Sequence, residues 1–390
     1  MPVYIHIPFC ARKCHYCDFH SFAGSQAQIT PYLDSLEREC EELRRMFGTI
    51  GVRTLYIGGG TPTLLNREQW QRLTEMIDRT FDLREMEEYT VEMNPGTVAF
   101  PTLELLKSHG VNRISLGVQS FDRDELRNLG RIHSVEDVCK TVEMLKTLQF
   151  DNWSMDLMYG LPGQNMQTWE NTLNQAMVLK PAHISAYNLK VEEGTPFYDQ
   201  WQRGELDLPD EDAVIEMYEM ARAVLRSNDY QHYEISNYCL HGKESKHNTA
   251  YWEHQEYLGI GSGAWSYLAD TRYANPALLH DYIQQYVVAT PPVSHWTEFL
   301  QRKREITVCD LQCRMEDYIM LHLRIYAGIS TKKFAEKFSI EFDKCFAEPL
   351  NKMLQLELMC RTDAGYRLSD KGVLLANEVM EAFFIDNLST

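Results

Sequence analysis

The sequence predicts an α/β fold: a partial (β/α)6 barrel, similar to a TIM barrel, followed by a C-terminal winged-helix-like α+β module. Six short runs rich in β-branched and aromatic residues alternate with helical stretches through roughly the first 240 residues. Six such units are too few for a closed eight-strand barrel. An open doubly wound sheet is disfavoured because no dinucleotide-binding fingerprint accompanies the strands.

The strand candidates are 3–7, 53–57, 89–93, 112–118, 152–158 and 183–189. Helices are expected between them at 28–47, 67–80, 101–109 and 134–148, with a further helix at 210–227. The helix after Ser134 has Asp137 three residues on, which is a capping-box pattern. In a barrel of this kind, functional groups lie in the loops that follow the carboxyl ends of the strands.

Three domains are expected from these patterns. Residues 1–235 form the barrel, residues 236–299 form a connecting segment, and residues 300–390 form the winged-helix-like module. Winged helices often bind DNA, but basic and acidic residues nearly balance in this module. We therefore expect it to pack on the barrel or on a partner protein.

Composition and charge narrow the classes of function. The chain has 390 residues, 44% of them hydrophobic, which suffices for one large and one smaller domain. Its formal net charge of −18 argues against a nucleic-acid partner, because phosphate binding requires clustered Lys and Arg. No run approaches the roughly 18 apolar residues of a membrane-spanning helix, and the N-terminus lacks a signal-peptide pattern. We expect a cytoplasmic protein with no integral membrane span.

Three cysteines, Cys10, Cys14 and Cys17, follow the first strand candidate with C-x3-C-x2-C spacing. One interpretation is structural zinc, which would need His15 or His20 as a fourth ligand. A second is a redox pair of Cys14 and Cys17, and a third is a [4Fe–4S] cluster with one iron left open for a ligand.

The other seven cysteines are spread through the chain and are expected to be small buried hydrophobic residues. Cys309 and Cys313 lie four residues apart, but no third ligand is near them in the sequence.

Other candidate residues share the rim position of the cysteine loop. The run Gly58–Gly60 with Thr61 follows the second strand, Glu92 ends the third, Gln119 follows the fourth, and Asp156 lies late in the fifth. A glycine run lets a ligand approach the backbone closely, although a tight turn would also explain it. Their common place in the barrel predicts one site.

The cysteine loop, with Tyr16 before its last cysteine, resembles the signature of the radical S-adenosylmethionine (SAM) superfamily. The resemblance implies that SAM binds the open iron through its amino and carboxylate groups. One electron from the cluster then cleaves SAM to a 5′-deoxyadenosyl radical. The SAM contacts that the resemblance implies are Tyr4, Gly59, Gly60, Thr61, Glu92, Gln119, Arg131 and Asp156.

Several motifs resemble a narrower family, that of oxygen-independent coproporphyrinogen III oxidase and its heme-chaperone relatives. They are YIHIPFC, GGGTPT, EMNPGT, GVNRISLGVQSF, YGLPGQ and YEISNY. The oxidase has a fourth cysteine where this chain has Phe19, and a long extension where this chain has three residues before Tyr4. Both differences favour the heme-chaperone branch.

The segment HNTAYW, residues 247–252, fits the HNxxYW motif of that branch. The resemblance implies heme binding in which His247 reaches the iron, Asn248 orients the imidazole, and Tyr251 and Trp252 face the porphyrin. Trp265 stands where relatives commonly place a histidine.

The expected function is therefore a heme chaperone, with a [4Fe–4S] cluster, SAM and heme as cofactors and heme-acceptor proteins as partners. It would act beside porphyrin biosynthesis, and a homodimer is left open as its oligomeric state. The alternatives are the oxidase itself and a zinc-stabilised binding protein.

Overall fold

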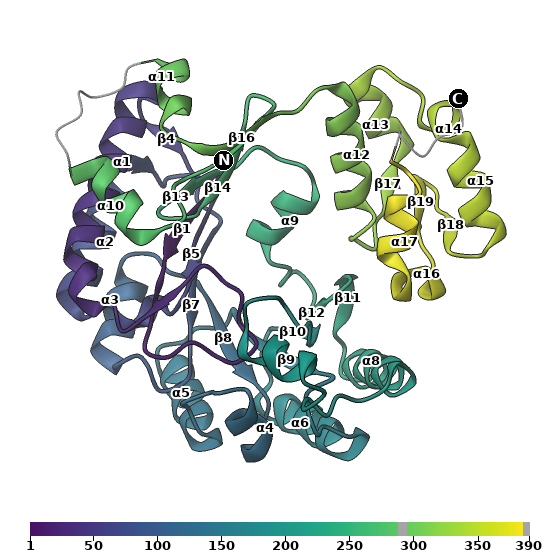
Figure 1. Cartoon of the computed structure of the whole chain (residues 1–390), viewed down its shortest axis with the longest axis horizontal. Helices are drawn as coiled ribbons and strands as arrows, with labels where there is room; N and C mark the ends of the chain where they lie inside the picture. The colour runs from purple at the N-terminus through teal and green to yellow at the C-terminus, as the bar shows by residue number, and fades with distance from the viewer. Residues whose placement is uncertain (288–294, 385–390) are drawn as a thin grey trace.

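In the computed structural model, which describes residues 1–287 and 295–384, the six expected strands form one parallel array. They are β1 (Pro2–Ile7), β5 (Thr54–Gly59), β7 (Glu88–Met93), β8 (Arg113–Gln119), β9 (Trp153–Tyr159) and β10 (His183–Asn188). Their order in space, β10-β9-β8-β7-β5-β1, follows the chain. The array curves as an open arc at the centre of Figure 1. The predicted partial barrel is confirmed.

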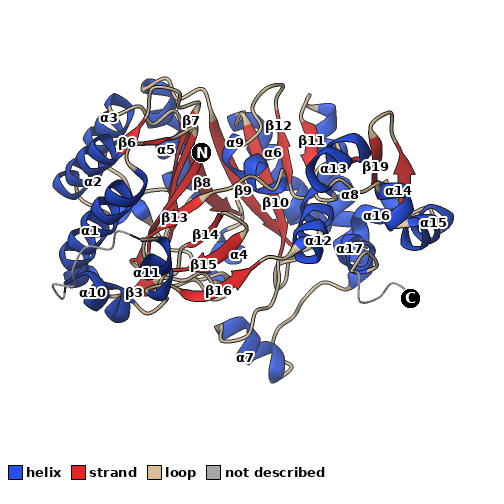
Figure 2. Ribbon diagram, turned by 90° about the horizontal axis from the view of Figure 1, so that it is seen from above, coloured by secondary structure: helices blue, strands red, loops and turns tan. Residues whose placement is uncertain are grey.

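Helices follow each of these strands, and all but the short helix at 196–202, which projects away from the sheet in Figure 2, cover the outer face of the arc (Figures 1 and 2). They are α1 (Ile29–Phe47), α2 (Arg67–Thr80), α3 (Phe100–Ser108), α4 (Arg123–Asn128), α5 (Val135–Thr147), α6 (Met166–Leu179), α7 (Pro196–Gln202) and α8 (Glu211–Ser227). Ser134 caps α5 in a capping box with Asp137, as the sequence predicts.

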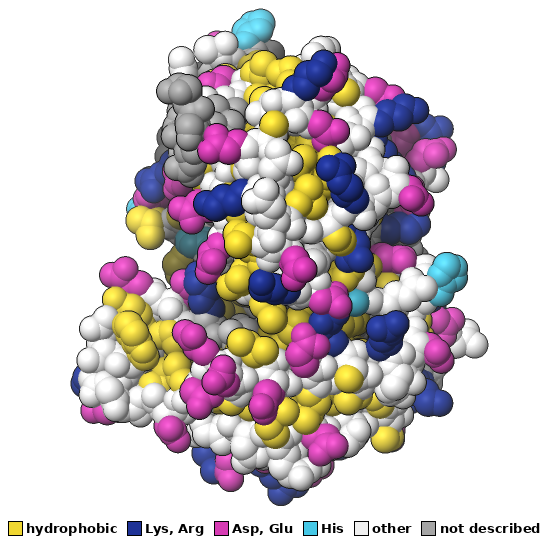
Figure 3. Space-filling model, turned by 90° about the vertical axis from the view of Figure 1, so that its right-hand side faces the viewer, with side chains coloured by type: hydrophobic (Ala, Val, Ile, Leu, Met, Phe, Trp, Pro, Cys, Tyr) yellow, Lys and Arg dark blue, Asp and Glu magenta, His cyan; other side chains and the backbone are white. Residues whose placement is uncertain are grey.

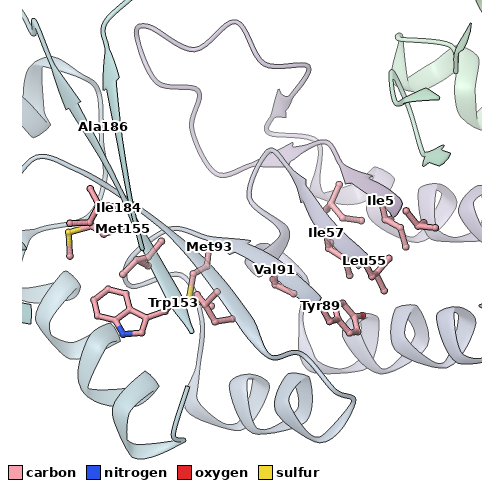
Figure 4. Packing of buried hydrophobic residues seen from close by; sticks show 14 of the residues in the cluster. Ile5, Leu55, Ile57, Tyr89, Val91, Met93, Trp153, Met155, Ile184 and Ala186 are labelled. Carbon is pink, nitrogen blue, oxygen red and sulfur yellow. The ribbon is translucent and has the colours of Figure 1, made fainter. Parts of the chain in front are cut away.

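The strands divide their side chains between two faces. Alternate residues such as Ile5, Leu55, Val91 and Met155 are fully buried against the helices and form the core in Figure 4. The intervening residues point into the barrel, and many of them are polar or aromatic. A parallel sheet buried on both faces usually carries apolar residues on both, so the polar inner face marks the barrel interior as the functional surface.

The expected connecting segment adds strands to both edges of the barrel sheet. Strand β13 (Leu258–Ile260) pairs parallel with β1, and β12 (Asn237–Cys239) pairs antiparallel with β10 and with β11 (Gln231–Glu234). Helix α9 (Lys246–Trp252) lies between these two edges, across the open side of the arc. Residues 288–294 of the expected segment lie outside the described residues.

A small sheet joins this segment to the C-terminal module. It contains β14 (Trp265–Leu268), β15 (Thr271–Ala274) and β16 (Arg304–Val308), and helices α10 (Leu279–Val287) and α11 (Trp296–Gln301) connect the last two strands. The expected boundary at residue 300 falls inside this unit, because β16 pairs with β15. Lys303, next to β16, is buried and forms an ion pair with Glu39 of α1, which ties this sheet to the barrel.

The C-terminal module has the helices and the three-stranded sheet of a winged-helix-like domain. Its helices are α12 (Leu311–His322), α13 (Thr331–Phe338), α14 (Phe342–Cys345), α15 (Ala347–Gln355), α16 (Asp370–Leu374) and α17 (Ala376–Glu381). Strands β17 (Ile329–Ser330), β19 (Gly365–Leu368) and β18 (Met359–Arg361) form the sheet. Basic and acidic side chains are interspersed on the face in Figure 3, so that face carries no basic patch. Residues 385–390 of the expected module lie outside the described residues.

No helix among the described residues is long and apolar enough to cross a bilayer.

Candidate functional site

The cysteine loop runs across the carboxyl end of the barrel. Cys10 lies in β2 (Phe9–Cys10), and β3 (Phe22–Ala23) returns to pair with it, so the loop is closed at its base. Within the loop, the Cys17 N–H donates to the carbonyl of Cys14 over 3.3 Å. Burial raises the pKa of the Cys17 thiol to about 11. Without a metal this thiol is therefore neutral at physiological pH, whereas iron binding would favour the thiolate.

One cavity of about 120 Å³ brings together the cysteines and almost all the residues that the resemblance assigns to SAM. We call it the cysteine cavity. The predicted residues that line it are Cys10, Cys14, Cys17, Gly59, Gly60, Thr61, Glu92, Gln119, Arg131 and Asp156. Residues more than 140 positions apart in the chain thus meet at one site.

The glycine run at the end of β5 is required by close contacts. Gly59 has φ +116°, and a Cβ there would lie 2.6 Å from the His6 ring. A Cβ at Gly60 would lie 2.6 Å from the Phe9 carbonyl oxygen and 3.0 Å from the Cys10 sulfur. A side chain at Gly60 would therefore fill the space beside Cys10, and one at Gly59 would collide with His6.

Two carboxyl groups on the inner face of the barrel point toward the same cavity. Glu92 accepts hydrogen bonds from the Tyr56 hydroxyl at 2.7 Å and from the Gly59 N–H at 2.9 Å. Burial raises the pKa of Glu92 to about 7, in spite of those bonds and with a further contribution from the charge of Asp156. Burial also raises the pKa of Asp156, which accepts a bond from Ser115 at 3.3 Å.

Arg131 connects the cysteine loop to the barrel. Its guanidinium donates to the Cys14 sulfur at 3.4 Å, to the Gly117 carbonyl at 2.7 Å and to Asn94. Its Nε is buried and has no partner in the described chain. Gln119, beside it, has φ +70° at the bulged end of β8. A strained residue and an unpaired donor in one cavity are typical of a ligand site.

Two residues of this site were not identified from the sequence. Asn94 donates to Thr61 at 2.9 Å and accepts from Arg131, and Tyr56 donates to Glu92. The sequence could have indicated both, because residues two apart along a strand face the same side. Tyr56 is two residues before Gly58 on β5, and Asn94 is two residues after Glu92.

The two histidines of the zinc alternative each use one ring nitrogen in a hydrogen bond, so the spacing of the cysteine sulfurs carries the comparison with a cluster. His15 Nδ1 hydrogen-bonds with the Asn128 carbonyl at 2.8 Å, and His20 Nε2 with Ser262 at 3.2 Å. Within the described residues, the three cysteine sulfurs do not all lie within 4.8 Å of one another. A single zinc ion needs ligands at about 2.0 to 2.3 Å, whereas each thiolate of a cluster binds a different iron.

A second cavity, of about 600 Å³, lies on the other side of the barrel interior, and we call it the aromatic cavity. Its walls come from β1, β5, β7, β10, α9, the 254–272 segment and α12. The residues that the sequence singled out and that line it are Tyr4, Glu92, His247, Asn248, Tyr251 and Trp265. Tyr4 lies here rather than in the cysteine cavity, and its place among the SAM contacts stays a prediction.

Helix α9 holds His247 firmly. His247 Nδ1 hydrogen-bonds with Thr54 Oγ1 at 2.9 Å, and Nε2 with the Tyr251 hydroxyl at 2.8 Å. Thr54 and Tyr251, not Asn248, therefore orient the imidazole. Burial lowers the His247 pKa to about 3, so the ring is neutral. Glu88 accepts the N–H groups of the first turn of α9 at 3.0 Å, which fixes the helix to β7.

Trp252, at the end of α9, is the member of the motif that lies outside this cavity. The Arg324 guanidinium stands 4.7 Å over its ring, in the segment that follows α12. Trp252 thus contacts the C-terminal module, and its expected porphyrin contact stays a prediction.

A third cavity, of about 270 Å³, joins the other two, and we call it the inner cavity. It shares Cys17, Gln119 and Asp156 with the cysteine cavity, and it shares Tyr56 and Asn248 with the aromatic cavity. Glu92 lines all three. Phe19, which is 64% exposed, lines both the cysteine cavity and the inner cavity.

Cys309 and Cys313 do have a third potential ligand, contrary to the sequence interpretation. Their sulfurs and a carboxylate oxygen of Asp317 lie within 4.8 Å of one another, because Asp317 is one turn beyond Cys313 on α12. Arg272 already donates to Cys313 and Asp317 at 3.2 Å each. The cluster is thus a neutralised polar group beside the aromatic cavity.

Comparison with known proteins agrees with this geometry. The radical SAM superfamily model matches residues 4–176, and the HemN C-terminal domain model matches residues 310–375. A solved structure of coproporphyrinogen III oxidase (HemN) from Escherichia coli, described as a radical SAM enzyme, aligns with a TM-score of 0.82. The alignment covers 99% of this chain and 90% of that one at 24% identity, so it shows the fold.

Full-length relatives define a narrower group. A protein of Lactococcus lactis named heme chaperone HemW is 38% identical over 99% of this chain and 98% of its own length. The Bacillus subtilis protein of the same name is 37% identical over 97% of this chain and 98% of its own.

A barrel with a three-cysteine loop and a glycine-lined cavity defines a radical SAM protein, and membership of that superfamily implies a [4Fe–4S] cluster and SAM. The chain belongs to the family of the heme chaperone HemW proteins within that superfamily.

Proposed function

We propose that this protein is a heme chaperone: it binds heme in the aromatic cavity and transfers it to acceptor proteins, while Cys10, Cys14 and Cys17 hold a [4Fe–4S] cluster with SAM on the open iron. The observation that carries the proposal is the aromatic cavity of about 600 Å³ against α9. Its size and its aromatic lining suit a flat, largely apolar ligand. The name of the full-length relatives agrees with it.

The cluster and SAM would occupy the cysteine cavity. The glycine backbone at 58–60 leaves room beside the Cys10 sulfur, Arg131 offers an unpaired donor, and Glu92 and Asp156 offer acceptors. When bound, the cluster supplies one electron for cleavage of SAM. The residues themselves bind and orient SAM and keep water from it, since Glu92 and Asp156 are buried deeply enough to have raised pKa values.

Anaerobic reconstitution followed by hemin titration tests the proposal. We expect absorption and EPR signals of a [4Fe–4S] cluster, a Soret band from stoichiometric heme, and transfer of that heme to a heme-free acceptor protein. A protein that holds zinc and no iron, or that fails to bind heme, would contradict the proposal.

The alternative function is that of oxygen-independent coproporphyrinogen III oxidase. The inner cavity favours it, since that cavity links the cysteines to the aromatic cavity through Glu92 and would let a radical reach a bound tetrapyrrole. Phe19, at the position where the oxidase has a cysteine, argues against it. Conversion of coproporphyrinogen III to protoporphyrinogen IX over many turnovers, in the presence of SAM and a reductant, would establish the oxidase instead.

The remaining features of the proposal follow from the chaperone role. We propose a cytoplasmic protein that acts beside porphyrin biosynthesis, without nucleic acid as a partner. Light scattering with and without heme would test whether the chain forms a homodimer.

A further inference from the structure

We infer that His254, two residues beyond the 247–252 motif, is the side chain that binds the iron of a tetrapyrrole in the aromatic cavity. The inference rests on the proposed function, because it concerns the same cavity. It assigns the iron ligand to a residue outside the motif.

Three histidines line the aromatic cavity, and two of them have both ring nitrogens engaged. His6 hydrogen-bonds with the Tyr4 hydroxyl at 2.8 Å and the His20 carbonyl at 2.7 Å. His247 hydrogen-bonds with Thr54 and Tyr251. Iron binding by either residue would first break a short internal hydrogen bond.

His254 differs from both. Its side chain is 94% buried, since its relative exposure is 6%, yet neither Nδ1 nor Nε2 has a hydrogen-bond partner in the described chain. It is the one histidine of the described residues for which both nitrogens are unpaired and buried. Buried polar atoms are almost always paired, so two unpaired nitrogens on one ring call for a ligand. A metal ion satisfies an imidazole nitrogen at no loss of an internal bond.

The backbone and the neighbours hold His254 at the cavity wall. It has φ +53°, its N–H donates to the Tyr251 carbonyl at 3.0 Å, and its carbonyl accepts from Lys337 of α13 at 3.3 Å. A non-glycine residue with positive φ is uncommon outside functional sites and turns. The ring lies nearly parallel to Tyr267, at 5.0 Å and 16°. Helix α9 and the C-terminal module thus fix the backbone of His254, and Tyr267 stacks on its ring.

The chemistry of the ring and of its surroundings suits iron. Burial first, and then the positive charge of Lys337, lowers the pKa of His254 to about 3, so the ring is neutral and keeps a lone pair. Arg272, which is paired with Asp317, lines the same cavity and adds a polar group to its wall. Tyr251 and Tyr257 add flat aromatic surface.

The test compares the full-length wild type with His254→Phe and His247→Phe. The phenylalanine at 254 keeps a ring against Tyr267 and removes both unpaired nitrogens, so we expect the apo variant to be at least as stable to heat as the wild type. Each protein is titrated with hemin and with iron-free protoporphyrin IX, and the hemin complexes are examined by absorption and EPR spectroscopy. Added imidazole is the rescue ligand.

We expect His254→Phe to weaken hemin binding about tenfold or more, to lose the spectrum of an imidazole-bound iron, and to bind protoporphyrin IX as the wild type does. Added imidazole should restore the lost spectrum, and His247→Phe should keep it. An unchanged hemin spectrum in His254→Phe, or equal weakening of both porphyrins, would overturn the assignment while leaving heme binding in place. A wild type that binds no hemin would overturn the chaperone function as well.

Discussion

The cysteine cavity and the aromatic cavity of this barrel differ in how many residues of their sequence motifs line the cavity with side chains available to a ligand. Every cysteine of the C-x3-C-x2-C motif lines its cavity. In the 247–252 motif, both ring nitrogens of His247 are engaged in hydrogen bonds, and Trp252 lies outside the aromatic cavity. The cysteine loop is held by the β2–β3 pair and by Arg131, and its three sulfurs still line one cavity. The other motif forms a helix, whose side chains point in several directions, so that some of them make internal contacts instead of facing the cavity.

The largest effect separates the two cavities completely. We expect Cys14→Ala to abolish cluster formation, because a three-cysteine site leaves no protein ligand in reserve. Hemin binding should stay within about twofold of the wild type, since Cys14 does not line the aromatic cavity. Iron and sulfide analysis and hemin titration measure both. Exposed Cys139→Ala is the matched control, and loss of hemin binding in Cys14→Ala would show that the cavities are coupled.

Glu92 lines both cavities, and burial raises its pKa. In the native state the carboxyl keeps its proton up to about pH 7, whereas the unfolded chain releases it near the ordinary value of about 4.5. Native stability is therefore greatest below pH 4.5 on account of this group, and it falls as pH rises to about 7. The difference is worth about 3 kcal/mol.

Glu92→Gln should remove that pH dependence. Denaturant unfolding of the cluster-free protein at pH 5 and pH 8 is the measurement, and the wild type should lose about 2.5 kcal/mol more than the variant between the two values. Glu104→Gln, at an exposed helix position, serves as the control. An identical pH dependence in wild type and Glu92→Gln would mean that Glu92 is ionised in the native barrel.

Much of the barrel could be predicted because its strands are short apolar runs that alternate with amphipathic helices. Contacts between residues that are distant in the sequence could not be predicted in this way. The sequence does not show that Asp317 joins Cys309 and Cys313, since that requires the α12 helix, nor that the three-residue strand β13 extends the barrel sheet beside β1. The pleat of β1 decides that Tyr4 faces the aromatic cavity, a fact that depends on strand register.

His247 supplies the third prediction, which tests whether its role is structural. Replacement by phenylalanine leaves the buried Thr54 hydroxyl without its partner and removes the bond to Tyr251. We expect the free energy of unfolding to fall by about 2 kcal/mol. Chemical denaturation measures it. Stability equal to the wild type would show that the two hydrogen bonds contribute nothing, and that the motif histidine is held for a ligand instead.

The smallest effect concerns Trp252, and it tests whether the last residue of the motif belongs to the aromatic cavity or to the junction with the C-terminal module. Trp252→Phe keeps an aromatic ring but weakens the cation–π interaction with Arg324, so unfolding should become easier by about 0.5–1 kcal/mol. Because Trp252 does not line the aromatic cavity, hemin affinity and the Soret band should be unchanged. Trp201→Phe, in the exposed helix α7, controls for the loss of an indole. A shift of the Soret band in Trp252→Phe alone would place the indole against the porphyrin and return Trp252 to the heme site.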